Sequence, residues 1–516
     1  MFSMNKKKDI ILIVLDTQRA NRLSCYGYSQ TTTPQLDQFA ERSTLFLRAI
    51  APAQWTIPTH ASIFTGLVPS QHTMLQMDSI LPVEIQTLAQ RLEKEGFKTI
   101  GISNNPLIGT MGNGLERGFS YMKNYNFWGA GLLNFRLNHH QITLQPSDVI
   151  KENLKFIAAE SLGYSEQTIL SKLKSFMPFL WEAFLSLRRK TKFDVTRQSL
   201  VDAAQLLLNK REKDDKPTFM FINLMGTHVP YAPPRWAVNK FSSMISNQRQ
   251  FFDLRRRVNQ IQVDVNNWVD CSSLSSMDAE ALNVFYDAEV FTQDLLLGEF
   301  FSLLESHGKL DEAFVIVVGD HGDHLGEKQQ INHAFGVYEE LVHVPLIIRD
   351  PQGVLKQGSK HKALVSTTQL FNTILEVAGA ASSDEITGSL RQAKDFQHLS
   401  EEKRESVFAQ GYPLEWALRR LKKGRSEDEG KALPHFAVYE DKFKLISAGD
   451  RLSLFDLTAD SEENMDLLVQ FPDVAIRLEK SLDRFLSANV PVAQNTTLDY
   501  EDSVIVEHLR ALGYLE

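Results

Sequence analysis

One short stretch of this chain concentrates side chains that could do chemistry. Thr56, Pro58 and His60 alternate along it, and Gly66 closes it. Pro58 has a fixed φ and no backbone N–H, so we expect Thr56 on a bend or first helical turn, with residues 59–65 continuing as a short helix. A threonine hydroxyl is a weak nucleophile until a base or a metal lowers its pKa. The stretch therefore requires metal ligands from elsewhere in the chain.

The chain supplies such ligands after two apolar runs. Asp16 follows the run of residues 10–15, and Asp320 and His321 follow the run of residues 314–319. Continuous runs of this kind are typical of strands buried on both faces of a parallel sheet. Because open α/β sheets place ligands at the carboxyl ends of their strands, we expect these side chains to meet at one edge.

Together with Thr56, these residues would give three oxygens and one nitrogen to a single divalent cation. The predicted metal ligands are Asp16, Thr56, Asp320 and His321. This donor set suits Mn²⁺ or Ca²⁺, with Zn²⁺ as a further option, and the imidazole disfavours Mg²⁺. The metal would activate Thr56 for in-line attack on phosphorus or sulfur, which gives a covalent intermediate on the threonine.

The spacing of the Thr56 stretch resembles a known signature. Thr56-x-Pro58-Thr59-His60, followed by Thr-Gly at 65–66, is similar to the sulfatase signature of the alkaline phosphatase superfamily, which has Cys or Ser, any residue, Pro, Ser, Arg and a later Thr-Gly. Thr56 replaces the cysteine or serine that becomes formylglycine, and His60 replaces the arginine. Both differences favour the threonine-nucleophile branches, which act on phosphate esters, phosphodiesters or phosphonates and include phospho-group transferases.

The resemblance implies roles for three histidines. His228, in a His-Val-Pro-Tyr segment after the strand-like run of residues 219–224, resembles the substrate-binding histidine loop of the family. His333 stands near the point where many sulfatases carry a lysine that binds the sulfuryl group. With His60, these rings would stabilise the equatorial oxygens of the transferred group or protonate the leaving alkoxide.

Two candidate substrate-binding residues each keep two interpretations. Asn104 ends the strand-like run of residues 98–103, where related sequences commonly place an asparagine near the substrate, but an asparagine pair before a proline is also good turn chemistry. Arg19 is either a substrate contact or a structural ion-pair partner. The family often has a second aspartate after the first, where this chain has Thr17.

The strand pattern and the resemblance predict an α/β fold. We expect an alkaline-phosphatase-like, mostly parallel central sheet flanked by helices, with a small C-terminal α+β subdomain. The catalytic domain would cover residues 1–385, with a helical insertion at 127–215 that matches nothing in the family. Short antiparallel-looking strands fill residues 386–516, and the turn at Asp441 predicts a hairpin.

Composition and charge exclude some classes of protein. With 516 residues and 43% hydrophobic content the chain can bury a large core, and the net charge of −9 argues against nucleic acid as the main partner. Cys25 and Cys271 are expected to be two thiols of a reducing compartment. The basic start and its short apolar run do not form a signal peptide, and no window reaches about 18 apolar residues. We therefore expect a cytoplasmic protein.

Residues 169–192 mix apolar and basic positions and predict an amphipathic helix. It is either a lid or buttress on the domain, or a peripheral contact with a lipid headgroup or membrane surface.

Three hypotheses of function follow. The first is a metal-dependent hydrolase of the sulfatase family that cleaves sulfate esters or phosphate mono- and diesters of a small molecule, sugar or lipid through Thr56. The second is a transferase that moves a phospho-headgroup onto a sugar or lipid alcohol. The third is a non-catalytic binding protein that retains the fold, against which the intact nucleophile and metal positions argue.

Overall fold

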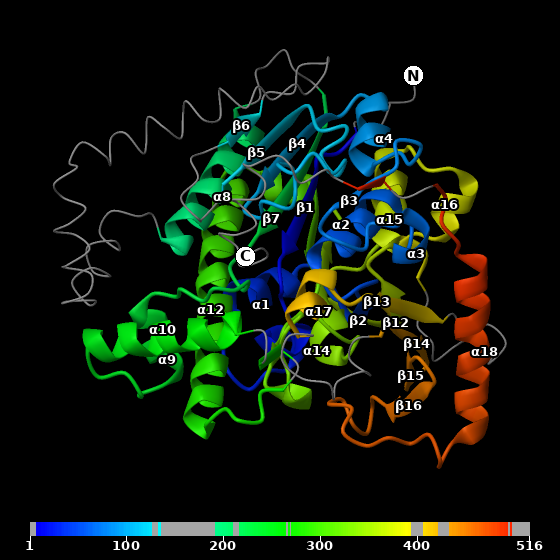
Figure 1. The fold of residues 1–516 in the computed structure, drawn as a ribbon. Helices are drawn as coiled ribbons and strands as arrows, with labels where there is room; N and C mark the ends of the chain where they lie inside the picture. The colour runs from blue at the N-terminus through cyan, green and yellow to red at the C-terminus, as the bar shows by residue number, and fades with distance from the viewer. Residues whose placement is uncertain are drawn as a thin grey trace, which may run out of the picture.

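A nine-stranded sheet runs through the centre of the molecule (Figure 1). β1 pairs in parallel with β7 and β8, whereas β11 and β6 run antiparallel to their neighbours. The predicted α/β fold with a mostly parallel sheet is thereby confirmed. In spatial order the strands are β12 (Ser359–Ser366), β2 (Thr44–Ile50), β11 (His343–Arg349), β8 (Phe314–Gly319), β1 (Ile10–Leu15), β7 (Thr218–Leu224), β4 (Lys98–Ser103), β5 (Tyr121–Asn124) and β6 (Leu133–Phe135).

The structure is a computed structural model. It describes residues 7–125, 133–135, 191–209, 216–264, 267–268, 270–393, 406–421, 433–493 and 496–497. Most of the predicted insertion at 127–215 lies outside these ranges.

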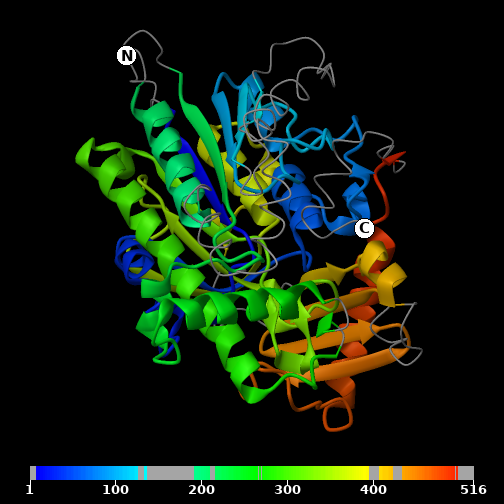
Figure 2. The ribbon, with the colours of Figure 1, turned by 60° about the vertical axis from the view of Figure 1, so that its left-hand side comes forward.

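Helices cover both faces of the sheet (Figures 1 and 2). Because successive side chains of a strand point to opposite faces, the apolar run of β1 feeds both layers. Ile11, Ile13 and Leu15 join one core, and the alternate residues join the other. The first layer contains α1 (Pro34–Glu41), α8 (Lys192–Leu208) and α12 (Ser276–Ser306), and the second contains α2 (Thr56–Thr65), α4 (Leu88–Lys94) and α15 (Gln369–Ala378).

The structure describes further helices and short strands outside these layers. α9 (Arg235–Phe241) and α10 (Gln248–Val263) pack against α12. The others include α3 (Pro69–His72), α13 (Lys309–Glu312), α14 (Glu339–Val342), α16 (Ser383–Thr387), α17 (Glu415–Leu421), and two paired sets of short strands, β9 (His324–Leu325) with β10 (Ile331–Asn332) and β3 (Ser79–Ile80) with β17 (Thr496–Thr497).

A second, antiparallel sheet forms the C-terminal subdomain. It consists of β13 (Val407–Gly411), β14 (His435–Glu440), β15 (Phe443–Ala448) and β16 (Arg451–Asp456), and α18 (Pro472–Ala488) packs on one face. The hairpin between β14 and β15 turns at Asp441, as predicted, with φ of 55° at that residue. β13 meets the main body where Gln410 N donates to Pro52 O at 2.8 Å.

α8 lies within the segment of residues 127–215 that was predicted to be a helical insertion. Its buried face places Leu200, Ala203 and Leu207 in the core under the central sheet, so this helix is part of the main layer. Lys192, at its first turn, is only 6% exposed and is turned inward. The peripheral membrane contact proposed for residues 169–192 stays a prediction, because residues 169–190 lie outside the described residues.

Two further features bear on the sequence analysis. In the part of the chain that the structure describes, no helix combines the length and the apolar character needed to cross a membrane. Cys25 and Cys271 both fall within the described ranges, and no disulfide joins them.

A buried group of charges joins the two sheets. Lys444 Nζ, on β15, lies 3.0 Å from Glu339 Oε1 of α14 and 2.7 Å from Glu463 Oε1, and the Lys444 and Glu463 side chains are fully buried. Tyr439 donates its hydroxyl to the same Glu339 oxygen at 2.7 Å. Removing one partner of such a group leaves the opposite charge in a low-dielectric interior.

We expect Lys444→Met to lower the free energy of unfolding by about 3–5 kcal/mol, because two buried carboxylates lose their cation. The matched control is Lys442→Met, whose side chain is 43% exposed in its pair with Asp456 and should cost less than about 1 kcal/mol. Urea unfolding of both variants measures the difference. Equal losses would show that the buried group does not hold the two sheets together.

Candidate active site

Two neighbouring parallel strands end side by side at the centre of the sheet. Leu15 of β1 pairs with Gly319 of β8, so Asp16 and Asp320 leave the sheet next to each other. Thr17 then turns the backbone sharply, with φ of 57°, and its N–H donates to Asp320 Oδ1 at 3.0 Å. The strand register alone therefore brings together two of the predicted metal ligands.

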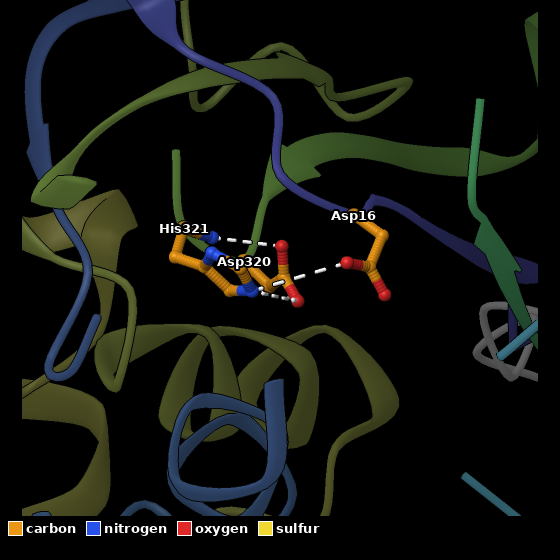
Figure 3. Close-up of side chains that lie close together, drawn as sticks. All are labelled: Asp16, Asp320 and His321. Atoms are coloured by element: carbon orange, nitrogen blue, oxygen red, sulfur yellow. Dashed lines mark hydrogen bonds and ion pairs between the residues drawn. The ribbon is translucent and has the colours of Figure 1, made fainter. Parts of the chain in front are cut away.

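Asp16, Asp320 and His321 form a fully buried cluster (Figure 3). His321 Nε2 lies 3.8 Å from Asp16 Oδ1 and 3.4 Å from Asp320 Oδ2. One ligand atom from each residue lies within 4.8 Å of the others. Three side chains from two strand ends thus converge on one point.

The hydrogen bonds around His321 show which of its nitrogens faces this point with a lone pair. His321 Nδ1 lies 2.8 Å from Gly322 O, and a carbonyl oxygen only accepts, so Nδ1 carries the proton. In the neutral ring, Nε2 is then an acceptor that faces two carboxylate oxygens. Among the described residues no hydrogen-bond donor reaches Asp16 Oδ1 or Asp320 Oδ2. A bound cation is the partner that satisfies three converging acceptors.

Burial makes the charges of this cluster costly when no cation is present. It raises the pKa of the Asp320 carboxyl well above its ordinary value, and the Asp16 carboxylate raises it further. Burial also lowers the pKa of His321 well below its ordinary value, with a further contribution from His333. The residues fit a divalent cation, whose charge offsets both carboxylates.

Thr56 lies beside this cluster at the start of α2. Its Oγ1 is 3.3 Å from His321 Nε2, and the side chain is 1% exposed. Trp55 precedes it in an extended conformation with no side-chain cap, so the first N–H groups of α2 and the helix dipole favour an anion at this end. Gly66 ends the helix with φ of 72°, as its Thr-Gly position suggests. The helix predicted at 59–65, with Thr56 in its first turn, is confirmed.

Two asparagines that the sequence analysis did not assign to the metal site hold Asp16 in place. Asn105 Nδ2 donates to Asp16 Oδ2 at 2.7 Å, and Asn223 Nδ2 lies 3.5 Å from the same oxygen. Both bonds occupy Oδ2, which leaves Oδ1 toward Asp320 and His321. The asparagine pair at the end of β4 was the available signal, but its first member was taken as the candidate.

His60 lies under the cluster and is engaged on both ring nitrogens. Nδ1 is 2.9 Å from Thr56 O and Nε2 is 3.3 Å from Asn223 Nδ2, with the ring fully buried. Burial lowers the pKa of His60, while the Asp16 carboxylate opposes that shift. These contacts place His60 in support of Thr56 and Asn223, and its contact with the transferred group stays a prediction.

His228 and His333 face each other above His321. The ring centroids of His228 and His333 are 5.4 Å apart, and those of His333 and His321 are 4.5 Å apart. His333 Nδ1 lies 3.1 Å from Asp323 Oδ1, and Tyr231 donates its hydroxyl to Asp323 Oδ2 at 3.0 Å. Because a carboxylate only accepts, His333 Nδ1 carries the proton and Nε2 is directed elsewhere. Asp323 and Tyr231 are further residues that the sequence analysis missed.

Arg19 and Asn104, the two candidate substrate contacts, both have hydrogen-bond or ion-pair partners within the protein. Arg19 is 2% exposed, and its Nη1 lies 2.8 Å from Glu327 Oε1 and 3.0 Å from Asp323 O. Asn104 accepts a bond from Ser199 Oγ at 3.2 Å and donates to Tyr125 O at 3.4 Å. Neither hydrogen-bonds the Asp16 cluster, so the predicted substrate-binding role is not supported for either residue.

Comparison with known proteins agrees with this geometry. Residues 8–380 match the Sulfatase family, and residues 326–488 match the C-terminal region of N-sulphoglucosamine sulphohydrolase. The chain belongs to the sulfatase family. The predicted resemblance and the ester-hydrolase class are thereby confirmed, and the family depends on metal, which agrees with the Asp16 cluster.

Curated relatives of this sulfatase-family chain extend over most of its length. It is 24% identical over 535 residues to arylsulfatase K of Gallus gallus, with 99% of this chain and 88% of the relative covered. It is 22% identical over 493 residues to N-acetylglucosamine-6-O-sulfatase of Bacteroides thetaiotaomicron, with 89% and 82% covered.

Solved structures share the fold. The phosphonate monoester hydrolase of Agrobacterium radiobacter gives a TM-score of 0.64 at 18% identity, covering 96% of this chain and 97% of that one. A structure in complex with its substrate D-glucosamine-2-N,6-O-disulfate gives 0.62 at 17% identity, covering 93% and 98%. The fold with its separate C-terminal antiparallel sheet is therefore that of this family.

We expect Asn105→Ala to weaken binding of Mn²⁺ about 10- to 100-fold, because the residue that orients a metal-ligating carboxylate is lost. Calorimetric titration of the metal-stripped protein measures the dissociation constant. Asn104→Ala is the matched control. The Asn104 side chain bonds Tyr125 and Ser199 instead of Asp16, so its removal should leave the affinity for Mn²⁺ unchanged. An unchanged affinity in Asn105→Ala would contradict the placement of the metal on Asp16.

Proposed function

We propose that this sulfatase-family hydrolase uses Thr56 as its nucleophile and acts on phosphate, phosphodiester or phosphonate esters before sulfate esters. The observation that carries the proposal is the position of Thr56 at the N-terminus of α2, with its Oγ1 3.3 Å from His321 Nε2. A secondary alcohol cannot form the aldehyde of formylglycine, so the chemistry favours direct transfer to the hydroxyl. The phosphonate monoester hydrolase fold neighbour supports the same substrate class.

Asp16, Asp320 and His321, with Thr56, would hold one divalent cation. Bound there, it supplies the positive charge that lowers the pKa of the Thr56 hydroxyl and offsets charge on the transferred group. The imidazole nitrogen favours Mn²⁺ over Ca²⁺, with Zn²⁺ as the second transition-metal option.

The surrounding residues divide the remaining work. Thr56 Oγ1 loses its proton to water and attacks phosphorus in line, which breaks the bond between phosphorus and the leaving oxygen. The N–H groups at the start of α2 face the other oxygens of the transferred group. His333 donates a proton to the leaving oxygen, because Asp323 holds its Nδ1–H and stabilises the charged ring. His228 lies across from His333 and contacts the same group, and water then releases the product and restores Thr56.

The organic part of the substrate is proposed to be a sugar or another small alcohol. Two of the similar proteins carry aminosugars in their names or complexes, the glucosamine sulfatase of Bacteroides thetaiotaomicron and the protein bound to D-glucosamine-2-N,6-O-disulfate.

We expect Mn²⁺-loaded protein to cleave aryl phosphate and bis-aryl phosphodiester faster than aryl sulfate, and Thr56→Ala to lower kcat by at least about 10³-fold. Thr56→Ser should retain measurable activity because it keeps a hydroxyl at the same place. Thr59→Ala is the control for damage to α2. It removes a hydroxyl from the same helix as Thr56, one that donates to Ala53 O. Faster sulfate turnover would reverse the substrate preference. Transfer to an added alcohol instead of water would favour the phospho-headgroup transferase.

The metal should also stabilise the folded chain, since three buried acceptors repel one another without it. At about 100 times its dissociation constant, Mn²⁺ should raise the free energy of unfolding by about 2.7 kcal/mol. Thermal unfolding of stripped and reloaded protein tests this expectation. Asp16→Asn should abolish most of the metal-dependent increase, and a full increase in that variant would place the cation elsewhere.

A further inference from the structure

Lys192 makes a buried set of contacts next to the site that the chemistry above does not use. It is the first residue of α8 and is 6% exposed. Its Nζ lies 2.5 Å from His228 O, 3.3 Å from Pro230 O and 3.2 Å from Glu289 Oε1 of α12. A lysine ammonium has three N–H donors, and each meets one acceptor here. All three donors of the Lys192 ammonium therefore bond groups of the protein.

These contacts fix the segment that carries His228. The ring donates from Nδ1 to Val229 O at 2.6 Å, so ring and backbone move together. Lys192 holds the carbonyl on each side of Val229, and Glu289 Oε1 accepts the N–H of Ala232 at 2.6 Å. Lys192 of α8 and Glu289 of α12 thus both hydrogen-bond the backbone of residues 228–232.

A direct contact between Lys192 and an anionic substrate does not fit this arrangement. The three donors already have acceptors, and Glu289 offsets the charge at 3.2 Å. The cavity beside Lys192, lined also by Asn104, Thr196 and Met225, measures about 10 Å³, which is room for roughly one water molecule.

We propose that Lys192 is a positioning residue, which holds His228 at the distance from His333 that the reaction needs. This inference rests on the proposed function. A displacement of about 1 Å in such a group can cost about 10²-fold in rate. Lys192 therefore acts through His228 without touching the substrate.

Two variants, compared with a control, separate a positioning role of Lys192 from a role in charge balance. Lys192→Met leaves the Glu289 carboxylate buried alone. Lys192→Met/Glu289→Gln removes that charge yet keeps the acceptor for Ala232 N–H, so its thermal stability should recover. We expect both variants to lower kcat on phenyl phosphate by about 10- to 100-fold, with a smaller loss on 4-nitrophenyl phosphate and little change in KM. Poor leaving groups depend more on the proton that His333 delivers, and His228 lies directly across from His333.

The matched control is Lys123→Met, which removes another ion pair with α8, between Lys123 Nζ and Asp202 Oδ2 at 2.6 Å. It should lower stability without changing the dependence of rate on the leaving group. Wild-type kcat in the double variant, or a uniform loss on both substrates, would overturn the proposal and leave Lys192 a charge-balancing residue.

A readout that does not need turnover keeps the two proposals distinguishable. In metal-free protein labelled with ¹⁵N at histidine, the Nδ1–H signal of His228 is identified by its absence from His228→Ala. We expect that signal in the wild type and its loss or broadening in the double variant. Wild-type protein that turns over no ester would contradict the proposed function, and an unchanged signal in the double variant would contradict the role of Lys192.

Discussion

The site is organised by a repulsion. Asp16 Oδ1, Asp320 Oδ2 and His321 Nε2 are three acceptor atoms at the ends of two paired strands, and no described donor reaches either carboxylate oxygen. Left alone in a buried position, such atoms cost free energy. Neighbouring hydrogen bonds maintain this arrangement. Asn105 occupies the other oxygen of Asp16, and the N–H groups of Thr17 and His321 occupy the other oxygen of Asp320.

Thr17 follows Asp16, so the buried cluster contains two carboxylates, Asp16 and Asp320. Two carboxylates match one divalent cation, so a third would leave a net negative charge facing an anionic ester. The N-terminus of α2 adds a partial positive charge on the side of the site that would face the ester. The sulfatase signature has an arginine where this chain has His60. His60 carries no permanent charge and instead hydrogen-bonds Thr56 O and Asn223.

Local patterns were enough for the strands and for the ligands that follow them. The apolar runs at 10–15 and 314–319 predicted β1 and β8 to the residue, because burial on both faces leaves little choice of side chain. Asn223, Asp323 and Lys192 escaped prediction because their roles depend on which loops meet across the sheet. Arg19 was left between two roles for the same reason, since its partner Glu327 is about 300 residues away in sequence and is supplied only by the fold.

The β1–β8 register also has a consequence for how the chain folds. Thr17, which follows the first ligand, is 303 positions from Asp320, to which its N–H donates. Closing a loop of that length precedes any gain from the contacts it makes. During synthesis, Asp16 therefore lies at the end of an unpaired edge of β1 until β8 has been made. The cation can be captured only by a chain whose central strands are already paired, which makes metal uptake a late event and ties it to correct assembly of the whole domain.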